Sequence, residues 1–362
     1  MTAVAVLGAG AGGLATAAEL TLGGHEVALW HPNPARLAPY RESGVTYRGA
    51  LGEGVATPAL VTDALGEALA RCEVAVVTLP AFLHDPVFTG LATAGRRLPV
   101  LLSPGHTGGA LHLRQVFCRA GAPAPAVAEL STLPYVARVD ENGAVNVTCC
   151  ARHLRCGVLP GGDEAATAAA VLFSSELAPG DVLASSLANV NLVLHPPGAV
   201  LGAAWIEATA GAFTFYVEGL TPGVARVAEA LDAERRAVAL RFGHALPTLV
   251  EEMSLIGTVE LPLPEGGGAG EATAAAISSG AANRSIAAPG SFAHRYYRED
   301  FSFGLAPFLA LADVAGEAAP IARSLLALGG VLAAATMPAP LDAAALGIEG
   351  CDVDALLAVV RP

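Results

Sequence analysis

The chain has 362 residues, 53% of them hydrophobic, and a formal net charge of −13 at pH 7. This length predicts two domains with sizeable buried cores, and the charge argues against nucleic acid or an anionic membrane surface as a partner. The apolar runs are short and broken by Gly, Pro or charged residues, so none reaches the roughly 20 residues of a membrane span. Six cysteines are scattered without a CxxC pair; this spacing argues against a structural zinc site, and no metal is expected.

Two further features of the sequence limit the possible reaction mechanisms and the expected location of the protein. All 20 residues counted as Lys or Arg are arginines, so the chain contains no lysine. Mechanisms that need a lysine base, a lysine Schiff base or a P-loop lysine are therefore excluded. The N-terminal sequence MTAVAVLGAGAGG has no basic segment before its first apolar run, which predicts a buried strand rather than a signal peptide and a cytoplasmic protein.

The first part of the chain alternates short apolar β-runs with helical patterns. Such alternation is typical of an α/β domain with a doubly wound, mainly parallel sheet. Strands are predicted at 3–7, 26–30, 73–79, 99–102, 126–132, 144–150 and 155–160, and helices after the first strand and around 63–71, 86–95 and 163–174.

A glycine-rich motif directly follows the first predicted strand. The stretch VAVLGAGAGGLATAAEL contains Gly8, Gly10 and Gly13 in the spacing GxGxxG, and a helical pattern follows. The first glycine permits a tight turn, the second lets the backbone approach a pyrophosphate, and the third allows close packing of helix on strand. The helix N-terminus then offers N–H groups to the phosphates. The motif predicts a dinucleotide-binding Rossmann domain whose cofactor contacts are Gly8, Ala9, Gly10, Ala11, Gly12 and Gly13.

The end of the second predicted strand bears on the choice of cofactor. NAD enzymes usually place Asp or Glu there to hold the ribose 2′-hydroxyl, whereas this chain has His31, followed by Arg36. No carboxylate would repel a 2′-phosphate, and Arg36 could pair with one, so NADP(H) is favoured over NAD(H); alternatively, Arg36 simply begins a solvated helix. Pro80 and Gly105, which follow later strands, are further expected cofactor contacts.

After about residue 186 the pattern changes to long helical periods. Residues 221–243 have a proline near their start and a glycine at their end, which predicts one long helix. Residues 319–335 predict another helix, and the Gly/Ala-rich segment 264–281 predicts a loop. We therefore expect a Rossmann domain over residues 1–186 followed by an all-α domain over residues 187–362.

The stretch NVNLVLHPPG, residues 189–198, places a histidine against two prolines. A lone histidine in an apolar stretch is more often a buried structural residue than a catalytic one. Asn191 lies four residues before His195, so the two share a face if the stretch is helical, although Asn191 could equally serve as a cap or an inter-domain hydrogen-bonding group. The prolines are expected to end or kink the helix beside His195.

Four other segments can be compared with this stretch, namely LPAFLHD (79–85), LSPGHTGGAL (102–111), FTFYVEGLTPGVARVAEALDAER (213–235) and HRYYREDFSFGLAP (294–307). Together with NVNLVLHPPG they resemble the opine dehydrogenase family of the octopine/nopaline type, and most of all its bacterial N-(1-carboxyethyl)-norvaline dehydrogenases. The resemblance covers nearly the whole chain. It implies a Rossmann domain, an all-helical domain and an active site between them. It also implies reductive condensation of an α-keto acid with the amino group of an amino acid or other amine.

The resemblance implies roles for individual residues. The family's catalytic histidine falls on His195, its partner aspartate on Asp300, and the arginine that holds the keto-acid carboxylate on Arg295. A histidine suits proton transfer near neutral pH, and a carboxylate on its far nitrogen would fix its tautomer. Glu299 is the second choice for that carboxylate, and Arg295 with Asp300 could instead form a surface ion pair.

Asn191 and Tyr216 complete the predicted substrate contacts, although a tyrosine such as Tyr216 is more often part of the core or the cleft wall than of the chemistry. Small-molecule substrates are the expected partners, and a homodimer is a further expectation. Ketopantoate reductases and β-hydroxyacid dehydrogenases are similar in architecture but rely on a catalytic lysine, which this chain lacks. A non-catalytic dinucleotide sensor with the same fold is the remaining alternative.

Overall fold

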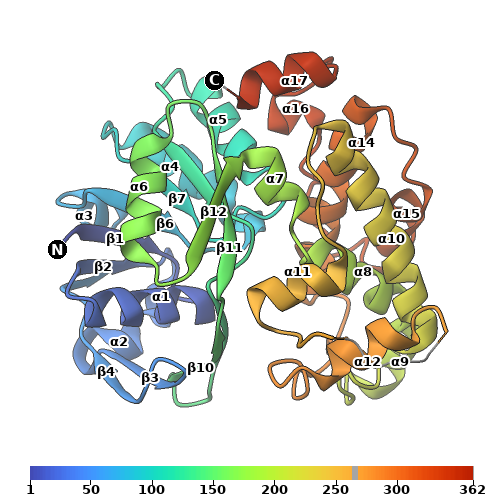
Figure 1. Ribbon diagram of the computed structural model, residues 1–362. Helices are drawn as coiled ribbons and strands as arrows, with labels where there is room; N and C mark the ends of the chain where they lie inside the picture. The colour runs from blue at the N-terminus through green and yellow to red at the C-terminus, as the bar shows by residue number, and fades with distance from the viewer. Residues whose placement is uncertain (263–267, 362) are drawn as a thin grey trace. The chain divides into compact units, whose positions relative to one another are not determined.

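The computed structural model describes residues 1–262 and 268–361. By its internal contacts the chain divides into two compact units (Figure 1). The first unit comprises residues 1–105, 109–182 and 361, and the second comprises 106–108 and 183–360. The chain thus enters the second unit for three residues, returns to the first, leaves it after Val182 and comes back to it at Arg361.

The first unit is built on an eight-stranded sheet of order β12-β11-β8-β7-β6-β1-β2-β5. Neighbours from β5 to β8 run parallel, the β8–β11 pair is antiparallel, and β11–β12 is parallel again. The predicted doubly wound, mainly parallel sheet is therefore confirmed. Its strands are β1 (Ala3–Leu7), β2 (Glu26–Trp30), β5 (Leu60–Thr62), β6 (Val74–Val77), β7 (Val100–Leu102), β8 (Val127–Leu130), β11 (His153–Val158) and β12 (Glu176–Asp181).

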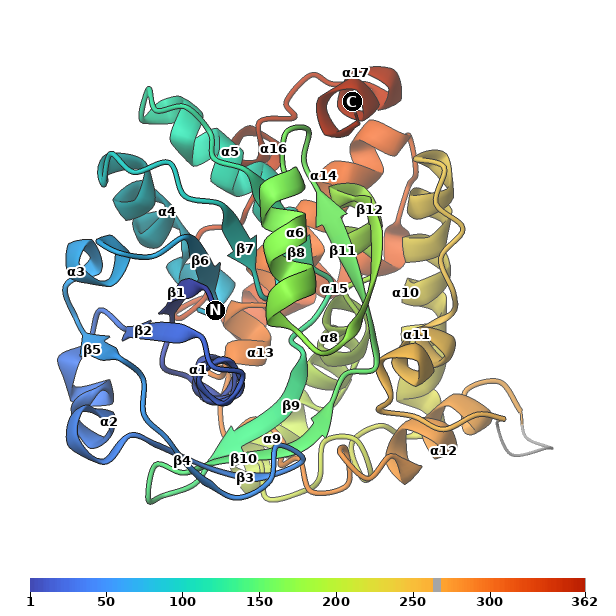
Figure 2. The same ribbon diagram turned by 60° about the vertical axis from the view of Figure 1, so that its left-hand side comes forward.

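Helices cover both faces of this sheet. Helix α6 packs on β7, β8 and β11, while α4 and α5 pack against each other, α5 also against β8 (Figure 2). The helices of this unit are α1 (Ala11–Leu22), η1 (Pro34–Arg36), α2 (Ala38–Ser43), α3 (Leu65–Leu69), η2 (Ala81–Leu83), α4 (His84–Thr93), α5 (Gly109–Arg119) and α6 (Asp163–Leu172).

A second, four-stranded sheet of order β4-β3-β10-β9 was not predicted from the sequence as a separate layer. Helix α1 packs on β1 and β2 of the large sheet and also on β3, β4, β9 and β10 of the small one. The first Rossmann helix is therefore enclosed between two sheets, which explains why most of its residues are buried. The strands are β3 (Val45–Gly49), β4 (Gly54–Ala56), β9 (Tyr135–Val139) and β10 (Val145–Cys150).

The second unit is helical, as predicted. Helix α8 packs against α10, α13 and α15, and α10 packs also against α12 and α14 (Figure 1). The helices are α7 (Val182–Leu187), α8 (Asn191–Leu201), α9 (Ala203–Thr209), α10 (Pro222–Arg241), α11 (Leu249–Ile256), α12 (Glu271–Ser279), α13 (Arg295–Arg298), the π-helix η3 (Phe301–Leu305), α14 (Ala306–Ala315), α15 (Pro320–Leu332), α16 (Ala343–Leu346) and α17 (Val353–Val360).

The structure corrects two expectations from the sequence. Helix α8 does not end beside His195 but continues through Pro196 and Pro197 to Leu201. Its residues from Leu192 to Ala199 are buried, so packing outweighs the main-chain hydrogen bonds that two prolines cannot donate. The segment 264–281, predicted as a loop, contains helix α12, because burial of its apolar side chains against α10 stabilises it; residues 264–267 lie outside the described residues.

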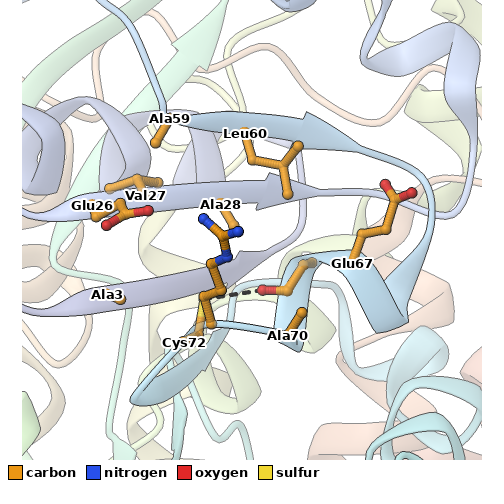
Figure 3. A pocket seen from close by; sticks show the side chains of 11 residues that line it. Ala3, Glu26, Val27, Ala28, Ala59, Leu60, Glu67, Ala70 and Cys72 are labelled. Carbon is orange, nitrogen blue, oxygen red and sulfur yellow. Dashed lines mark hydrogen bonds between the residues drawn. The ribbon is translucent and has the colours of Figure 1, made fainter.

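A cavity of about 480 Å³ lies at the amino-terminal ends of β1, β2 and β5, beside α3 (Figure 3). Ala3, Glu26 and Leu60, which begin these strands, contribute to its lining. Dinucleotides bind at the carboxyl ends of such strands, so this cavity is not the cofactor site. Across residues 1–262 and 268–361, no helix combines the length and the apolar composition that a membrane span requires.

Candidate active site

The predicted cofactor residues of the first unit gather at one edge of the large sheet. Gly8, His31, Pro80 and Gly105 follow β1, β2, β6 and β7 respectively, and these four strands are adjacent and parallel. The chain order reverses at β1, since β2 lies on one side of it and β6 on the other. The carboxyl edge at such a reversal is where α/β sheets bind dinucleotides.

The three motif glycines face different surroundings. Gly8 has a φ of +142°, and a Cβ on Gly13 would overlap the Gly8 carbonyl oxygen. These two positions therefore require glycine for the fold itself. A Cβ on Gly10 would meet no atom within 4 Å, so that position faces open space. Helix α1 begins directly after Gly10 and has no acidic side chain in its first turn, which leaves its amino end electropositive.

His31 is buried at the end of β2, and its Nδ1 accepts a hydrogen bond of 3.0 Å from the Asn33 N–H. Burial lowers the pKa of His31, and the positive charge of Arg36 lowers it further against the opposing effect of the Asn33 bond. The imidazole is thus neutral at pH 7, and Arg36 lies within electrostatic reach of it. The end of β2 therefore presents a neutral ring and a cation where NAD enzymes usually place an acid.

Three residues follow the next two strands: Thr78 and Pro80 come after β6, and Gly105 comes after β7. Pro80 precedes the short helix η2 and is partly exposed. Gly105 donates its N–H to Leu130 O at 3.0 Å, and a Cβ there would overlap the Glu129 carboxylate. The requirement for glycine at position 105 is thus explained by packing. Thr78 was not predicted, although its hydroxyl donates to the Leu7 and Gly8 carbonyls and so supports the glycine loop.

His195 is the centre of a buried polar cluster in the second unit. Its Nδ1 lies 2.7 Å from Asp300 Oδ2 and its Nε2 lies 2.7 Å from the Tyr216 hydroxyl. The Tyr296 ring stacks on the imidazole with centroids 3.7 Å apart, and the Phe215 ring meets it edge-on. His195 and Asp300 are each only 3% exposed. The structure thus brings His195, Asp300 and Tyr216 together.

Asp300 immediately precedes the π-helical turn η3, a feature frequent at functional sites. Burial raises the pKa of Asp300 well above its ordinary range, and the neighbouring Glu299 raises it further, while Arg295 and His106 oppose both effects. A buried carboxyl group is easier to ionise when its neighbour carries a positive charge, so the 2.7 Å hydrogen bond links the charge of Asp300 to that of His195.

Asn191 begins α8 on the same helix as His195, but it does not cap that helix. The N-cap residue is Val190. The Asn191 N–H donates to Asn189 Oδ1 at 3.1 Å, and Asn189 Nδ2 donates to Thr107 Oγ1 at 3.2 Å. The side chain of Asn191 is partly buried. Its helical spacing of four from His195 leaves a role beside that histidine open.

Known proteins match this chain in sequence. Residues 179–333 match the α-helical domain of NAD/NADP octopine/nopaline dehydrogenase, and residues 4–101 match ketopantoate reductase PanE/ApbA. A curated opine dehydrogenase from Arthrobacter sp. (strain 1C) is 32% identical over 329 residues, which make up 90% of this chain and 89% of that relative. The chain belongs to the opine dehydrogenase family. It is accordingly an NAD(P)-dependent oxidoreductase.

Solved structures share the opine dehydrogenase fold at lower sequence identity. Octopine dehydrogenase in complex with NADH and agmatine matches with a TM-score of 0.75 and 19% identity, over 100% of this chain and 99% of its own. Yersinopine dehydrogenase with bound NADP⁺ matches with a TM-score of 0.73 and 16% identity, over 98% and 95% of the two chains. One opine dehydrogenase structure thus holds NADH and the other NADP⁺.

A second charged group adjoins the histidine cluster. Glu299 is buried, with Oε1 at 3.1 Å from His106 Nε2 and Oε2 at 3.9 Å from Arg295 Nη1. Arg295 is 47% exposed and lies over the Tyr296 ring, 5.8 Å from its centroid. The adjacent acids thus face different bases, Asp300 facing His195 and Glu299 facing His106. A surface pair between Arg295 and Asp300 is ruled out, because Asp300 is buried.

Sequence reasoning missed the roles of Tyr296 and His106. The only signal for Tyr296 was its place in the polar–aromatic segment HRYYRED. From sequence, His106 is equally a loop residue or a ligand contact after a strand, and its φ of +56°, unusual for a residue other than glycine, cannot be read from sequence. Their positions depend on loops that bring distant segments together.

The unequal surroundings of the glycines give a testable contrast. Gly10→Ala should leave the melting temperature within about 2 °C of wild type but weaken NADPH binding at least tenfold, since the added methyl fills space needed by a pyrophosphate. Gly13→Ala should lower the melting temperature by itself, since its Cβ overlaps backbone. Differential scanning fluorimetry with and without NADPH measures both. Equal behaviour of the two variants would refute the assignment of Gly10 as the cofactor-facing position.

Proposed function

We propose that the protein catalyses the NAD(P)H-dependent reductive condensation of an α-keto acid with the amino group of an amino acid or another amine. The reaction proceeds through an imine and gives an N-(carboxyalkyl) amino acid. The observation that carries this proposal is the 2.7 Å hydrogen bond between His195 and Asp300. Both residues lie within the segment that matches the octopine/nopaline dehydrogenase domain.

The glycine loop after β1 suits a dinucleotide. Gly10 offers room for a close approach, Gly8 and Gly13 hold the turn, and the first turn of α1 carries no acid that would oppose a diphosphate. These residues and the amides of Ala11 and Gly12 would hold the pyrophosphate. A bound reduced nicotinamide supplies the hydride that reduces the imine carbon.

Proton transfer falls to His195. A base must deprotonate the substrate ammonium before it attacks the keto carbon, and an acid must assist loss of water from the carbinolamine. An imidazole serves both steps near neutral pH. Asp300 on Nδ1 fixes the tautomer and stabilises the imidazolium form. The chain has no lysine that could take this part instead.

Arg295 suits the keto-acid carboxylate. Its guanidinium is half-exposed, and Tyr296 connects it to the histidine by contact with both groups. Glu299 approaches it only to 3.9 Å, so donor groups remain for a bidentate bond to a substrate carboxylate. Asn191, on the same helix as His195, is a second polar group for the substrate.

The surroundings of His31 support NADPH as the preferred cofactor, because Arg36 can pair with a 2′-phosphate and residues 31–36 after β2 include no acid. His31→Asp should shift the ratio of kcat/KM for NADPH over NADH toward NADH by at least tenfold. Arg36→Ala should weaken NADPH use while leaving NADH use within about twofold. Steady-state kinetics with both cofactors measures these ratios, and an unchanged ratio in both variants would refute the preference.

A coupled-substrate assay tests the proposed activity. NADPH or NADH is supplied with pyruvate, 2-oxoglutarate or glyoxylate against a panel of amino acids and amines, and nicotinamide absorbance is followed. Amine-dependent oxidation, with a secondary amine identified by mass spectrometry, supports the proposal. Oxidation by the keto acid alone would indicate a hydroxyacid dehydrogenase, and no oxidation with any pair would favour a dinucleotide sensor. Homodimer formation and a cytoplasmic location stay predictions.

A further inference from the structure

Both ring nitrogens of His195 are already engaged. Nδ1 forms a hydrogen bond with Asp300 and Nε2 forms one with the Tyr216 hydroxyl, each at 2.7 Å. One face of the ring is covered by Tyr296, and the Phe215 ring lies at its edge. In this arrangement the imidazole has no nitrogen left to touch a substrate, although the proposed function requires it to exchange protons with one.

Tyr216 is held firmly in this position. Its ring packs at 85° on Phe215, whose N–H donates to Ile286 O at 2.8 Å and whose ring fills the space beside Gly198. The Tyr216 side chain is itself buried. A tyrosine that merely obstructed the histidine would have to leave this packing in every catalytic cycle. A fixed hydroxyl, in contrast, is a pre-organised proton carrier.

We propose that Tyr216 is a catalytic residue, whose hydroxyl passes protons between the substrate and His195 Nε2. The proposal rests on the proposed function and names the group that touches the reacting nitrogen. When the ammonium loses its proton, an N–H bond breaks and the proton bonds to the Tyr216 oxygen, while the phenolic proton moves to Nε2. The imidazolium so formed is stabilised by Asp300. The freed amine then attacks the keto carbon: the C–N bond forms, the C=O π electrons move to the oxygen, and a proton passes from the nitrogen to that oxygen to give the carbinolamine.

The protons return by the same route in the dehydration step. Nε2–H gives its proton to the Tyr216 oxygen, and the phenolic proton goes to the carbinolamine hydroxyl. The C–O bond breaks, water leaves and the nitrogen lone pair forms the C=N bond of a protonated imine, so that His195 and Tyr216 regain their starting states. No phenolate accumulates in either direction. This agrees with burial and the nearby Tyr296, which raise the pKa of Tyr216 well above its ordinary range although Arg295 opposes them.

The test is Tyr216→Phe, with Tyr297→Phe as the matched control. Tyr297 is also buried in the second unit, and its hydroxyl donates to the Ala199 carbonyl at 2.7 Å, away from His195. Tyr216→Phe should lower kcat by about 10²-fold or more, in the range of general acid–base catalysis. Its NADPH dissociation constant should not change, and Tyr297→Phe should retain kcat within about threefold.

Single-turnover rates in mixtures of H₂O and D₂O provide a measurement that needs no variant. A two-proton transfer should give a curved dependence on deuterium fraction in the wild type, and a straight line would overturn the relay. Unchanged or increased kcat in a folded Tyr216→Phe variant would also overturn it and would make the tyrosine an obstruction. If the wild type itself shows no amine-dependent turnover, the proposed function fails, and the relay with it. If the wild type is active and the Tyr216→Phe variant is equally active, the relay is refuted while the proposed function stands.

Discussion

Replacement of His195 by alanine is expected to lower kcat by about 10²–10⁴-fold, the contribution typical of general acid–base catalysis. The fold should survive, because Asp300 can take up a proton when its partner is lost, as the direction of its pKa shift indicates. NADPH should bind as in the wild type, since the glycine loop belongs to the other unit. Steady-state kinetics and fluorescence titration with NADPH measure the two properties.

His112→Ala is the matched control for this experiment. His112 is another buried histidine beside an aspartate, with Nε2 at 3.3 Å from Asp85 Oδ1, but it lies on α5 in the first unit. Its replacement should leave kcat within about threefold of wild type. Turnover by His195→Ala within tenfold of wild type would show that the proton carrier lies elsewhere.

Replacement of Arg235 by methionine is expected to cost about 3–5 kcal/mol of stability, as breaking a buried ion pair does. Arg235 is 0% exposed, and its guanidinium bonds Asp232 Oδ1 and donates to the carbonyls of Leu187 and Pro247 at 2.8 Å each. One side chain thus joins α10 to the end of α7 and to the segment before α11. Methionine replaces only its aliphatic stem and satisfies none of these acceptors.

Arg236→Met supplies the control, since Arg236 bonds the same Asp232 at 3.1 Å but is 40% exposed. Its loss should cost less than about 1 kcal/mol. At about 2–4 °C per kcal/mol, the two variants should differ clearly in the melting temperature of the whole chain. If Arg235→Met unfolds at the same temperature as Arg236→Met, the buried network does not carry the stability assigned to it.

The large sheet was predictable because its central strands are continuous apolar runs. Those at 3–7 and 26–30 coincide with β1 and β2. The small sheet was harder, because β4 has only three residues and the last two residues of β9 are exposed, so neither strand is a continuous apolar run. They are stabilised by packing against α1, a non-local contact. Helix α12 was missed because the glycines of the Gly/Ala-rich segment 264–281 suggest a loop, although they all lie outside the helix Glu271–Ser279.

In the candidate site, too, some features can be predicted from a short stretch of sequence, whereas others depend on contacts between distant segments. The glycine spacing and the histidine between apolar residues are local signals, and comparison of motifs directed attention to Asp300. Adjacent acids cannot be assigned to their partners from sequence, and only the structure pairs Glu299 with His106. The position of Tyr216 on Nε2 depends on how residues 213–216 are held against α8. A sequence offers no rule for such an arrangement.

Residues 106–108 belong to the second unit although the residues on either side of them belong to the first. This limits how parts of the protein can be exchanged with those of relatives. His106 pairs with Glu299, Thr107 accepts from Asn189, and the Gly108 N–H donates to Ser186 Oγ at 3.0 Å. A chimera joined at the obvious junction near Val182 would graft the helical part onto a foreign 106–108 loop. To inherit a substrate preference intact, such a hybrid must take this tripeptide together with the helical part.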